Sequence, residues 1–437
     1  MLLRMRHCCM LMNPINEAAT KGHSTKLSAR LDSRSLTVLL AAFLAIAGWT
    51  LASVSVIRGF DFWVSSPTNL THLAINVACS LLTAVYASRV RGSLDFKLGR
   101  AVAATVVVFG LYAAAILVGR LFFSRSMFIA AVVGALLVSG LVVWLRHRLT
   151  RTRVAVIGPL IGATKISIPF GRVVNDPGAD LRGFDIVLVS LSEVVSADWA
   201  RALSRAMLAG CKVRHVGEYI EELNGAVSLE HFEVDHLPPN GIASYQLIKR
   251  LLDLGLVVFI LPVALPLTLL SSAAVLLTTG RPIFFLQERI GLGGAPFRMW
   301  KLRTMRPERE GEALRAAVVG DSRVTPVGRI LRRFRIDELP QFWNVLKGDM
   351  SLIGPRPEAT PLHREYLGKL PNYSYRYLVR PGITGWAQVS SPPSASSDEA
   401  RRKLTYDLFY VKKLSLLLDL QIVVKTFWTI TSGGGVR

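Results

Sequence analysis

Four long apolar runs occupy the first third of the chain. They lie at about 35–57, 67–87, 99–119 and 126–145. Each run is close to the ~20 residues that a helix needs to cross the hydrocarbon core of a bilayer. Their interiors lack ionisable side chains, with His72 near the start of the second run as the nearest exception, so they do not resemble a transport path. The pattern predicts a cytoplasmic tail at 1–34 and a bundle of four transmembrane helices within 35–150.

Arginine and lysine residues gather at three places beside these runs. They precede the first run, separate the second from the third, and follow the fourth: Arg30 and Arg34; Arg89, Arg91, Lys97 and Arg100; Arg146, Arg148, Arg151 and Arg153. The loop after the first run carries only Arg58, balanced by Asp61. Because cytoplasmic flanks of membrane spans collect positive charge, we expect both ends of the bundle to lie on the cytoplasmic side.

The pattern changes between residues 151 and 236, where short apolar runs alternate with an amphipathic segment. The expected elements are strands at 153–158, 184–192 and 211–217 and a helix at 197–210. Strands and a helix joined by short connections are typical of a parallel, Rossmann-like α/β domain. Gly158 and Gly162 do not form the glycine pattern of a dinucleotide site, and no acidic residue is placed to bind a ribose. We therefore expect a scaffold or regulatory role, with nucleotide binding as the alternative.

A fifth apolar run extends over residues 245–280 and contains two prolines. Pro262 and Pro266 each remove a helix hydrogen-bond donor and clash with the preceding turn, so a break or a sharp kink is expected. The run is either a fifth, kinked span or a re-entrant hairpin that enters and leaves on one face. A full span would place the basic segment from Arg281 to Arg335 outside. Because positive segments are retained in the cytoplasm, the hairpin is favoured.

Composition narrows the class of protein. The 437 residues carry a formal net charge of +22, and 51% of them are hydrophobic. The charge would suit nucleic acid, but the basic residues fall at membrane flanks and no recognition fold is evident, so we expect no nucleic-acid partner. The four cysteines, Cys8, Cys9, Cys79 and Cys211, have neither metal-ligand spacing nor a plausible disulfide framework.

The candidate chemistry is concentrated at residues 332–358 (RRFRIDELPQFWNVLKGDMSLIGPRPE), where Asp337 and Glu338 are adjacent. Basic residues flank this pair on both sides: Arg332, Arg333, Arg335, Lys347 and Arg356. Apolar residues at helical spacing are also consistent with a salt-bridged amphipathic helix. The Gly-Pro-Arg-Pro segment at 354–357 favours a tight loop that presents a guanidinium to a phosphate. A carboxylate pair among such cations suggests a nucleophile and a metal ligand.

The remaining C-terminal segments have weaker patterns. Residues 284–305 begin as a strand and turn at glycines, and residues 378–389 predict a second tight loop at a ligand. Residues 392–400 have the composition of a linker. Residues 403–430 are apolar and basic with a helical period, which predicts an interfacial helix. Within it, Asp407 is either a second acidic residue near a metal or a structural helix partner.

Residues 249–430 resemble the bacterial sugar transferases, that is the polyprenyl-phosphate hexose-1-phosphate transferases or monotopic phosphoglycosyl transferases. The matching strings are KRLLD (249–253), FLQERIG (285–291), FRMWKLRTM (297–305), RIDELPQFWNVLKGDMSLIGPRPE (335–358), RPGITGWAQV (380–389) and YDLFYVKKLSLLLDLQIVVKT (406–426). The four spans and the Rossmann-like unit ahead of them resemble the larger members, which start exopolysaccharide or O-antigen repeat units. The fold class implied is a mixed membrane protein with a mainly α-helical catalytic domain at 245–437.

The resemblance implies a reaction and roles for particular residues. A UDP-sugar gives its sugar-1-phosphate to undecaprenyl phosphate and releases UMP, with Asp337 as nucleophile, Glu338 as ligand of Mg²⁺ and Arg356 as a phosphate ligand. Further candidates for substrate and phosphate binding are Lys301, Arg303, Gln287, Arg289, Arg380 and Gln388. Glucose or galactose is the expected sugar, and a homo-oligomer is possible. The implied location is the bacterial inner membrane, with the catalytic domain in the cytoplasm.

Two points leave alternatives open. Small members of the family have a Ser-Pro pair at the helix break, whereas this chain has Leu265–Pro266, so the angle of the break is expected to differ. A leucine side chain cannot satisfy a freed backbone carbonyl as a serine can. The alternative function is a non-catalytic membrane scaffold or a sugar-nucleotide sensor for polysaccharide assembly.

Overall fold

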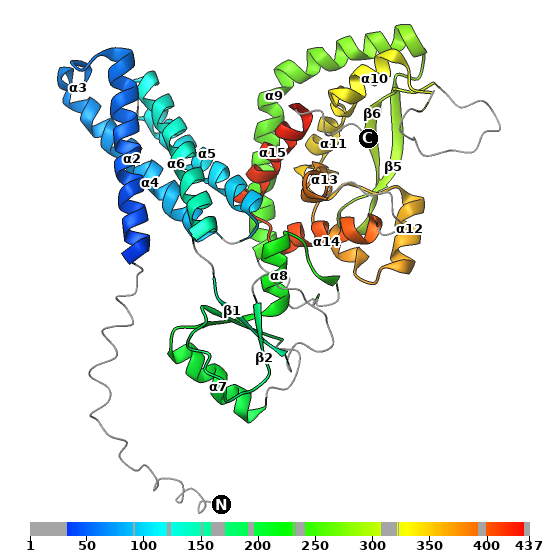
Figure 1. Ribbon diagram of the computed structural model, residues 1–437. Helices are drawn as coiled ribbons and strands as arrows, with labels where there is room; N and C mark the ends of the chain where they lie inside the picture. The colour runs from blue at the N-terminus through cyan, green and yellow to red at the C-terminus, as the bar shows by residue number, and fades with distance from the viewer. Residues whose placement is uncertain are drawn as a thin grey trace, which may run out of the picture.

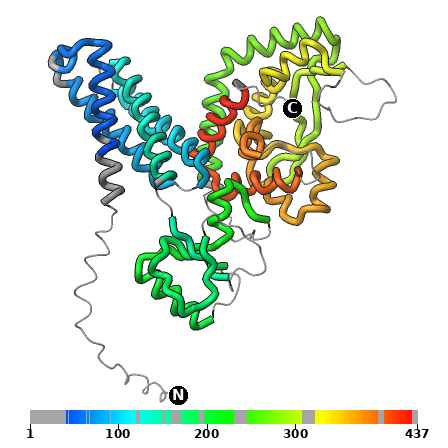
Figure 2. Tube along the Cα trace, viewed as in Figure 1, coloured from blue at the N-terminus to red at the C-terminus, as the bar shows by residue number. Residues whose placement is uncertain are grey.

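The computed structural model describes most of the chain between residues 33 and 431. The described ranges are 33–90, 92–119, 124–149, 152–158, 171–190, 196–229, 232, 241–306, 321, 323–391 and 399–431. Figure 1 shows an N-terminal helical bundle beside a larger C-terminal part, with a small α/β part below the junction of the two. The tube in Figure 2 follows the same three parts along the chain. The described structure is mostly helical, as the sequence predicts.

The N-terminal bundle contains helices at all four of the predicted spans. Its helices are α2 (Ser33–Arg58), the short α3 (Phe62–Ser65), α4 (Pro67–Arg89), α5 (Leu94–Val118) and α6 (Arg125–Leu149). The described residues of α4, α5 and α6 are long and apolar enough to cross a membrane, and those of α2 include a shorter apolar helix. The helices pack closely: a Cβ atom on Gly134 of α6 would lie 2.6 Å from Trp49 of α2. The Trp49 indole also donates to the carbonyl of Ala130 at 3.0 Å.

The α/β part is built on a parallel sheet of four strands in the order β2-β1-β3-β4. Its elements are β1 (Val154–Ile157), β2 (Gly171–Val174), β3 (Ile186–Val189), α7 (Ala197–Leu208), β4 (Lys212–His215) and α8 (Val216–Asn224). Alternate residues of β1 and β3 pack against α7 on one face and against the start of α8 on the other. The three predicted strands and the predicted helix are present, whereas β2 and α8 were not expected. The last strand ends at His215, because the chain turns there into α8.

The predicted hairpin segment forms one bent helix, α9 (Gly241–Thr279), with Pro262 and Pro266 inside it. Figure 1 shows that α9 bends sharply part-way along, and that its second arm passes above α10 and the hairpin of β5 and β6. The Thr268 hydroxyl donates to the carbonyl of Ala264 at 2.7 Å, a bond that favours helix bending. The two prolines thus kink the helix without interrupting it.

The C-terminal part combines an antiparallel hairpin, a short parallel strand pair and several helices. Its elements are β5 (Phe284–Ile290), η4 (Leu292–Gly294), β6 (Pro296–Leu302), α10 (Pro326–Arg333), η5 (Ile336–Glu338), α11 (Gln341–Lys347), β7 (Ser351–Ile353), α12 (Thr360–Lys369), η6 (Tyr373–Leu378), β8 (Gly382–Thr384), α13 (Trp386–Ser390), α14 (Glu399–Lys412) and α15 (Leu416–Thr431). The segment 403–430 forms two helices, not the single helix that the periodicity predicts. Aromatic residues of α14, Phe409 and Tyr410, are fully buried in the core, so protein covers this part of the segment.

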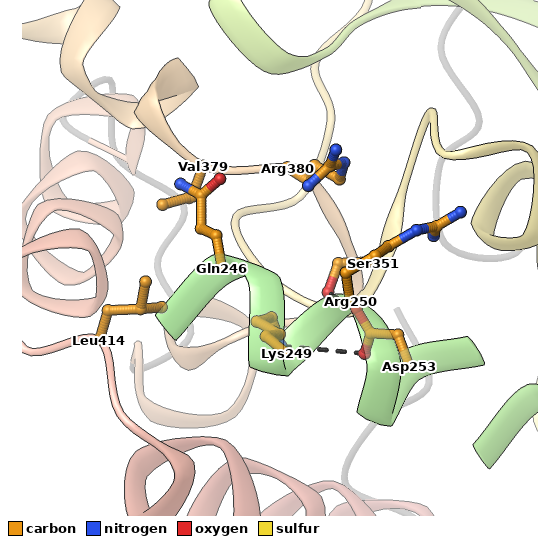
Figure 3. A pocket seen from close by; sticks show the side chains of 8 residues that line it. All are labelled: Gln246, Lys249, Arg250, Asp253, Ser351, Val379, Arg380 and Leu414. Carbon is orange, nitrogen blue, oxygen red and sulfur yellow. Dashed lines mark hydrogen bonds and ion pairs between the residues drawn. The ribbon is translucent and has the colours of Figure 1, made fainter. Parts of the chain in front are cut away.

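A buried polar network fixes the first turns of α9 to the C-terminal part. Lys249 donates to Asp419 of α15 at 2.7 Å, and Tyr245 and Tyr410 each donate to the same carboxylate at 2.8 Å. One turn further along α9, the Ser351 hydroxyl donates to Asp253 at 2.6 Å. Figure 3 shows Lys249 and Asp253 beside Ser351. These side chains line a cavity of about 10 Å³, the size of one water molecule.

Removing the ammonium group of this network is expected to destabilise the fold strongly. In a Lys249→Met variant, the carboxylate of Asp419 stays buried without its cation, which costs about 3–5 kcal/mol of unfolding free energy. The matched control is Lys369→Met, because Lys369 pairs with Glu365 at 2.6 Å on the surface. Thermal unfolding in nanodiscs should show a large fall of Tm for the first variant and little change for the second. Equal shifts would contradict a structural role for the network.

Candidate active site

The two adjacent carboxylates lie on a short 3₁₀ turn, η5, between α10 and α11. The Thr325 hydroxyl caps α10 by accepting from the Gly328 amide at 2.9 Å. Just after α10, Arg335 has a φ of 58°. Among the residues that the structure describes, it is the one non-glycine residue whose φ is positive. This left-handed residue turns the chain inward, so that the exposed fractions of Asp337 and Glu338 are only 8% and 6%. The stretch that the sequence predicts as an amphipathic helix is therefore two helices, α10 and α11, with the turn η5 between them.

Glu338 accepts contacts from cations on three segments. The Lys301 ammonium on β6 donates to Glu338 Oε1 at 2.9 Å, and a guanidinium nitrogen of Arg356 lies 3.5 Å from the same oxygen. Arg335 lies 3.6 Å from Glu338 Oε2. Burial alone would raise the pKa of Glu338, but Lys301, Arg356 and Arg335 together lower it to about 2. This carboxylate is therefore ionised throughout the physiological pH range.

Asp337 lies in a different electrostatic environment from its neighbour. Burial and the negative charge of Glu338 raise the pKa of Asp337 to about 6, against the opposing effect of Lys301, Arg332 and Arg335. At pH 7 roughly nine in ten of these carboxyl groups are ionised. Its Oδ1 atom is buried and has no hydrogen-bond partner in the described structure. A buried, charged oxygen without a partner is costly, which marks it as a candidate for a ligand or a reaction.

The loop that carries Arg356 is held by close backbone packing and by a buried ion pair. Cβ atoms at Gly354 and Gly382 would lie 2.4 Å and 2.0 Å from backbone atoms of the facing loop, so both positions require glycine. Arg376 donates to the Arg356 carbonyl at 2.8 Å and to Asp407 at 2.7 Å. Arg376 and Asp407 are nearly fully buried. Asp407 is thus engaged as the structural partner of an arginine.

Two further candidates lie beside this loop. Arg289 donates to the Pro357 carbonyl at 3.0 Å and to Gln287 Oε1 at 2.6 Å. Burial and the neighbouring Arg356 guanidinium lower the pKa of Arg289, which places it in the same cationic cluster. The structure therefore brings together Lys301, Arg356 and Arg289, with Gln287 orienting the last of these.

Three other candidates contact backbone away from the carboxylate pair. Arg303 donates to the carbonyl of Arg281 at 3.2 Å, and Arg380 donates to the carbonyl of Gly348 at 3.1 Å. Gln388 donates to the carbonyl of Ile383 at 3.3 Å. Figure 3 shows Arg380 at the cavity beside α9. In this structure the three residues stabilise loops, and their predicted contact with substrate stays a prediction.

Sequence reasoning did not assign the roles of Arg335 and Arg376. The first was noted only as a flanking charge, and the second lies in a tyrosine-rich stretch without a motif. A positive φ at an arginine leaves no signal in one sequence, and the partner of Arg376 on α14 is 31 positions away. Asn344 was also missed; it joins α11 to β6 by accepting from the Trp300 amide at 3.1 Å.

The residues at the carboxylate pair fit a magnesium ion. Mg²⁺ is usually held by one or two carboxylates together with substrate phosphates and water, which needs no larger cluster of acidic side chains. Among the described residues no group of three or more potential metal ligands occurs. Glu338 is ionised at neutral pH and would be the carboxylate ligand of such an ion.

Comparisons with known proteins indicate the family of the chain. A family model described as bacterial sugar transferase matches residues 244–433. An N-acetylgalactosaminephosphotransferase of Aeromonas hydrophila, named for UDP-N-acetylgalactosamine and undecaprenyl phosphate, is 38% identical over 335 residues. These are 74% of this chain and 78% of the relative. The chain belongs to the bacterial sugar transferase family. The carboxylate pair and its cations lie within the residues that the family model matches.

Two further relatives match shorter stretches of the chain. A UDP-glucose:undecaprenyl-phosphate glucose-1-phosphate transferase of Caulobacter vibrioides is 46% identical over 180 residues, 41% of this chain and 67% of the relative. An Escherichia coli protein of the same name is 36% identical over 209 residues, 47% of this chain and 44% of the relative.

Two substitutions at Arg335 should separate its backbone role from its charge. Arg335→Gly and Arg335→Val both remove the cation, but only glycine adopts the left-handed conformation without strain. We expect the valine variant to be less stable than the glycine variant by about 1–2 kcal/mol. Chemical unfolding of both purified proteins measures the difference. Equal stability would show that the turn does not depend on the conformation of this residue.

Proposed function

We propose that the protein transfers a sugar-1-phosphate from a UDP-sugar to undecaprenyl phosphate through a covalent intermediate on Asp337. The observation that carries the proposal is the unpartnered, buried Asp337 Oδ1 beside an ionised carboxylate and a cluster of cations. Family membership and the names of the relatives support the general reaction. The step is assigned to Asp337, because Glu338 is already neutralised by Lys301 and Arg356.

In the first step Asp337 attacks the sugar-proximal phosphorus of the UDP-sugar. A bond forms between the carboxylate oxygen and phosphorus, the diphosphate bond breaks, and UMP leaves with the bonding electrons. In the second step a phosphate oxygen of the lipid attacks the same phosphorus, and the aspartate is released as a carboxylate. The products are UMP and a sugar linked by diphosphate to undecaprenol. Because the attacking carboxylate is largely ionised at neutral pH, the first step needs no general base.

The cations overcome the repulsion between the attacking carboxylate and the substrate diphosphate. Lys301, Arg335 and Arg356 surround Glu338 and provide positive charge where the transferred phosphoryl group develops negative charge. Glu338 is the residue that would hold Mg²⁺, and the ion would supply further charge neutralisation to the diphosphate. Arg376 keeps Arg356 in place through its backbone carbonyl.

We further propose that the protein resides in the bacterial inner membrane with its site on the cytoplasmic face. Much of α9 exposes large apolar side chains, such as Phe259, Val263 and Leu270, which suits contact with lipid. Its bend supports a re-entrant arrangement, in which the kinked helix enters and leaves on one side. Such a helix would hold the site at the level of the lipid phosphates. The parallel sheet at β1–β4 is consistent with a Rossmann-like scaffold or regulatory domain.

The relatives suggest two sugars to test first. The relative named for N-acetylgalactosamine matches 74% of this chain, whereas those named for glucose match 41% and 47%. UDP-N-acetylgalactosamine and UDP-glucose are therefore the first donors to assay, followed by UDP-galactose.

Replacing the proposed nucleophile should abolish turnover. We expect Asp337→Asn to lower the rate of UMP release at least about 1,000-fold, because an amide oxygen is a poor nucleophile towards phosphorus. The matched control Glu365→Gln, also a carboxylate-to-amide change but at an exposed residue, should retain wild-type turnover. Mass spectrometry of wild-type protein incubated with UDP-sugar and Mg²⁺ without lipid should find the sugar-phosphate adduct on Asp337. Turnover by Asp337→Asn would exclude the covalent step, and UDP-sugar binding without any turnover by wild type would favour the sensor alternative.

Removal of divalent cations should stop the reaction reversibly. With EDTA we expect turnover to fall about 100-fold, since the cations of the protein alone neutralise less of the diphosphate charge. Excess Mg²⁺ should restore the rate. Full activity of a metal-stripped enzyme would show that the reaction does not use a metal.

A further inference from the structure

A second cavity lies where the three parts of the chain meet, away from Asp337 and Glu338. Its volume is about 410 Å³, and its walls come from α4, α5, α8 and α14. Figure 1 shows the adjoining ends of α4 and α5 approaching α8 and α14. The N-terminal bundle, the α/β part and the C-terminal part therefore all contribute to one site.

Three cations line this cavity with too little negative charge to balance them. They are Arg89 at the end of α4, Arg100 on α5 and Lys413 just after α14. In the part of the chain that the structure describes, no carboxylate lies within ion-pair distance of any of the three. The lining carboxylate, Glu222, accepts two hydrogen bonds from Arg214, each 2.8 Å long. The cavity thus has a clear excess of positive charge.

Aromatic rings complete the walls of the cavity. The guanidinium of Arg100 lies over the ring of Phe96, 5.2 Å from its centroid. Phe96 in turn packs edge-to-face against Phe409, with their ring centroids 6.1 Å apart. Tyr86 also lines the cavity. Cations above an apolar wall, with a polar aromatic group at the rim, suit an amphiphilic anion better than a fully hydrated one.

The place of the cavity along the chain indicates which anion it takes. Arg89 ends one apolar helix and Arg100 lies in the second turn of the next, so the cations mark the boundary between apolar and basic segments. Basic pockets between membrane helices on the cytoplasmic side bind anionic lipid head groups. We propose that this cavity binds the phosphate of an anionic phospholipid head group. The bound lipid joins the bundle to the C-terminal part.

The surrounding contacts explain why such a ligand would stabilise the junction. Lys412, next to Lys413, donates to Glu221 of α8 at 2.8 Å, and both side chains are buried. The Trp386 indole donates to the Gly225 carbonyl at 2.7 Å just after α8. A phosphate held between Arg89, Arg100 and Lys413 adds an ionic contact between the bundle and the C-terminal part. It lies beside the Lys412–Glu221 ion pair and the Trp386 hydrogen bond. Ligand that binds only the folded form raises its stability.

The test compares thermal unfolding of the full chain in nanodiscs of two compositions. One contains phosphatidylcholine alone, and the other contains phosphatidylcholine and phosphatidylglycerol in equal parts. For wild type we expect the anionic discs to raise Tm by about 2–4 °C. The triple variant Arg89→Gln, Arg100→Gln, Lys413→Gln should lose this rise. A control variant with the same charge loss at exposed positions of the α/β part, Arg172→Gln, Arg205→Gln, Lys212→Gln, should keep it.

A second arm identifies the source of the phosphate. Inorganic phosphate is added to the wild-type protein in discs of phosphatidylcholine alone. If added phosphate raises Tm and discs with phosphatidylglycerol do not, the ligand is free phosphate and the lipid assignment is overturned. No rise in wild type, or an equal rise in the triple variant, would overturn the site. Should the triple variant fail to fold, Lys413→Gln alone should show a smaller rise than wild type, and an unchanged rise would contradict the proposal. Because Tm is read without substrate, the result is independent of catalysis.

Discussion

The buried charge of Glu338 is the constraint around which the C-terminal part is organised. A carboxylate removed from water must be compensated by nearby cations, or it costs several kcal/mol. Here the compensation comes from the hairpin strand β6, from the turn η5 and from the loop after β7. Each of these segments is placed by its own packing, so the site can form only when the surrounding fold is complete. The same cations leave Asp337 charged but without a hydrogen-bond partner at Oδ1.

Buried ion pairs also connect the parts of the molecule. Asp419 on α15 holds the first turns of α9 through Lys249, and Asp407 on α14 holds the loop that carries Arg356 through Arg376. Glu221 on α8 pairs with Lys412 at the end of α14. Apolar packing is not directional and tolerates small shifts of one element along another. A buried ion pair is stable only when its two side chains meet, so each pair fixes the relative position of the two elements. The two C-terminal helices thus relate the membrane-facing helix, the α/β part and the site to one another.

This arrangement is consistent with a protein whose surface meets both lipid and water. The exposed apolar surface of α9 and of the N-terminal helices suits contact with lipid, while the cations around the carboxylate pair would suit the anionic, water-soluble substrate proposed above. The bend at Pro262 and Pro266 divides α9 into two arms. The first arm is fixed to the C-terminal part, and the second arm passes over α10 and the β5–β6 hairpin. The cavity at the junction is lined on the side of the bundle by Arg89 and Arg100.

The sequence by itself determined the helices of the bundle, three strands of the parallel sheet, the kinked helix and the identity of the carboxylate pair. These features depend on run length, periodicity and adjacent residues, whose effects act over a few positions. Only the tertiary structure decided that Lys301 and Arg356 converge on Glu338, that Arg303, Arg380 and Gln388 contact other loops, and that Asp407 pairs with Arg376. Lys301 and Glu338 are 37 positions apart, and such pairings depend on how separate elements pack. One sequence carries no local signal for that distance.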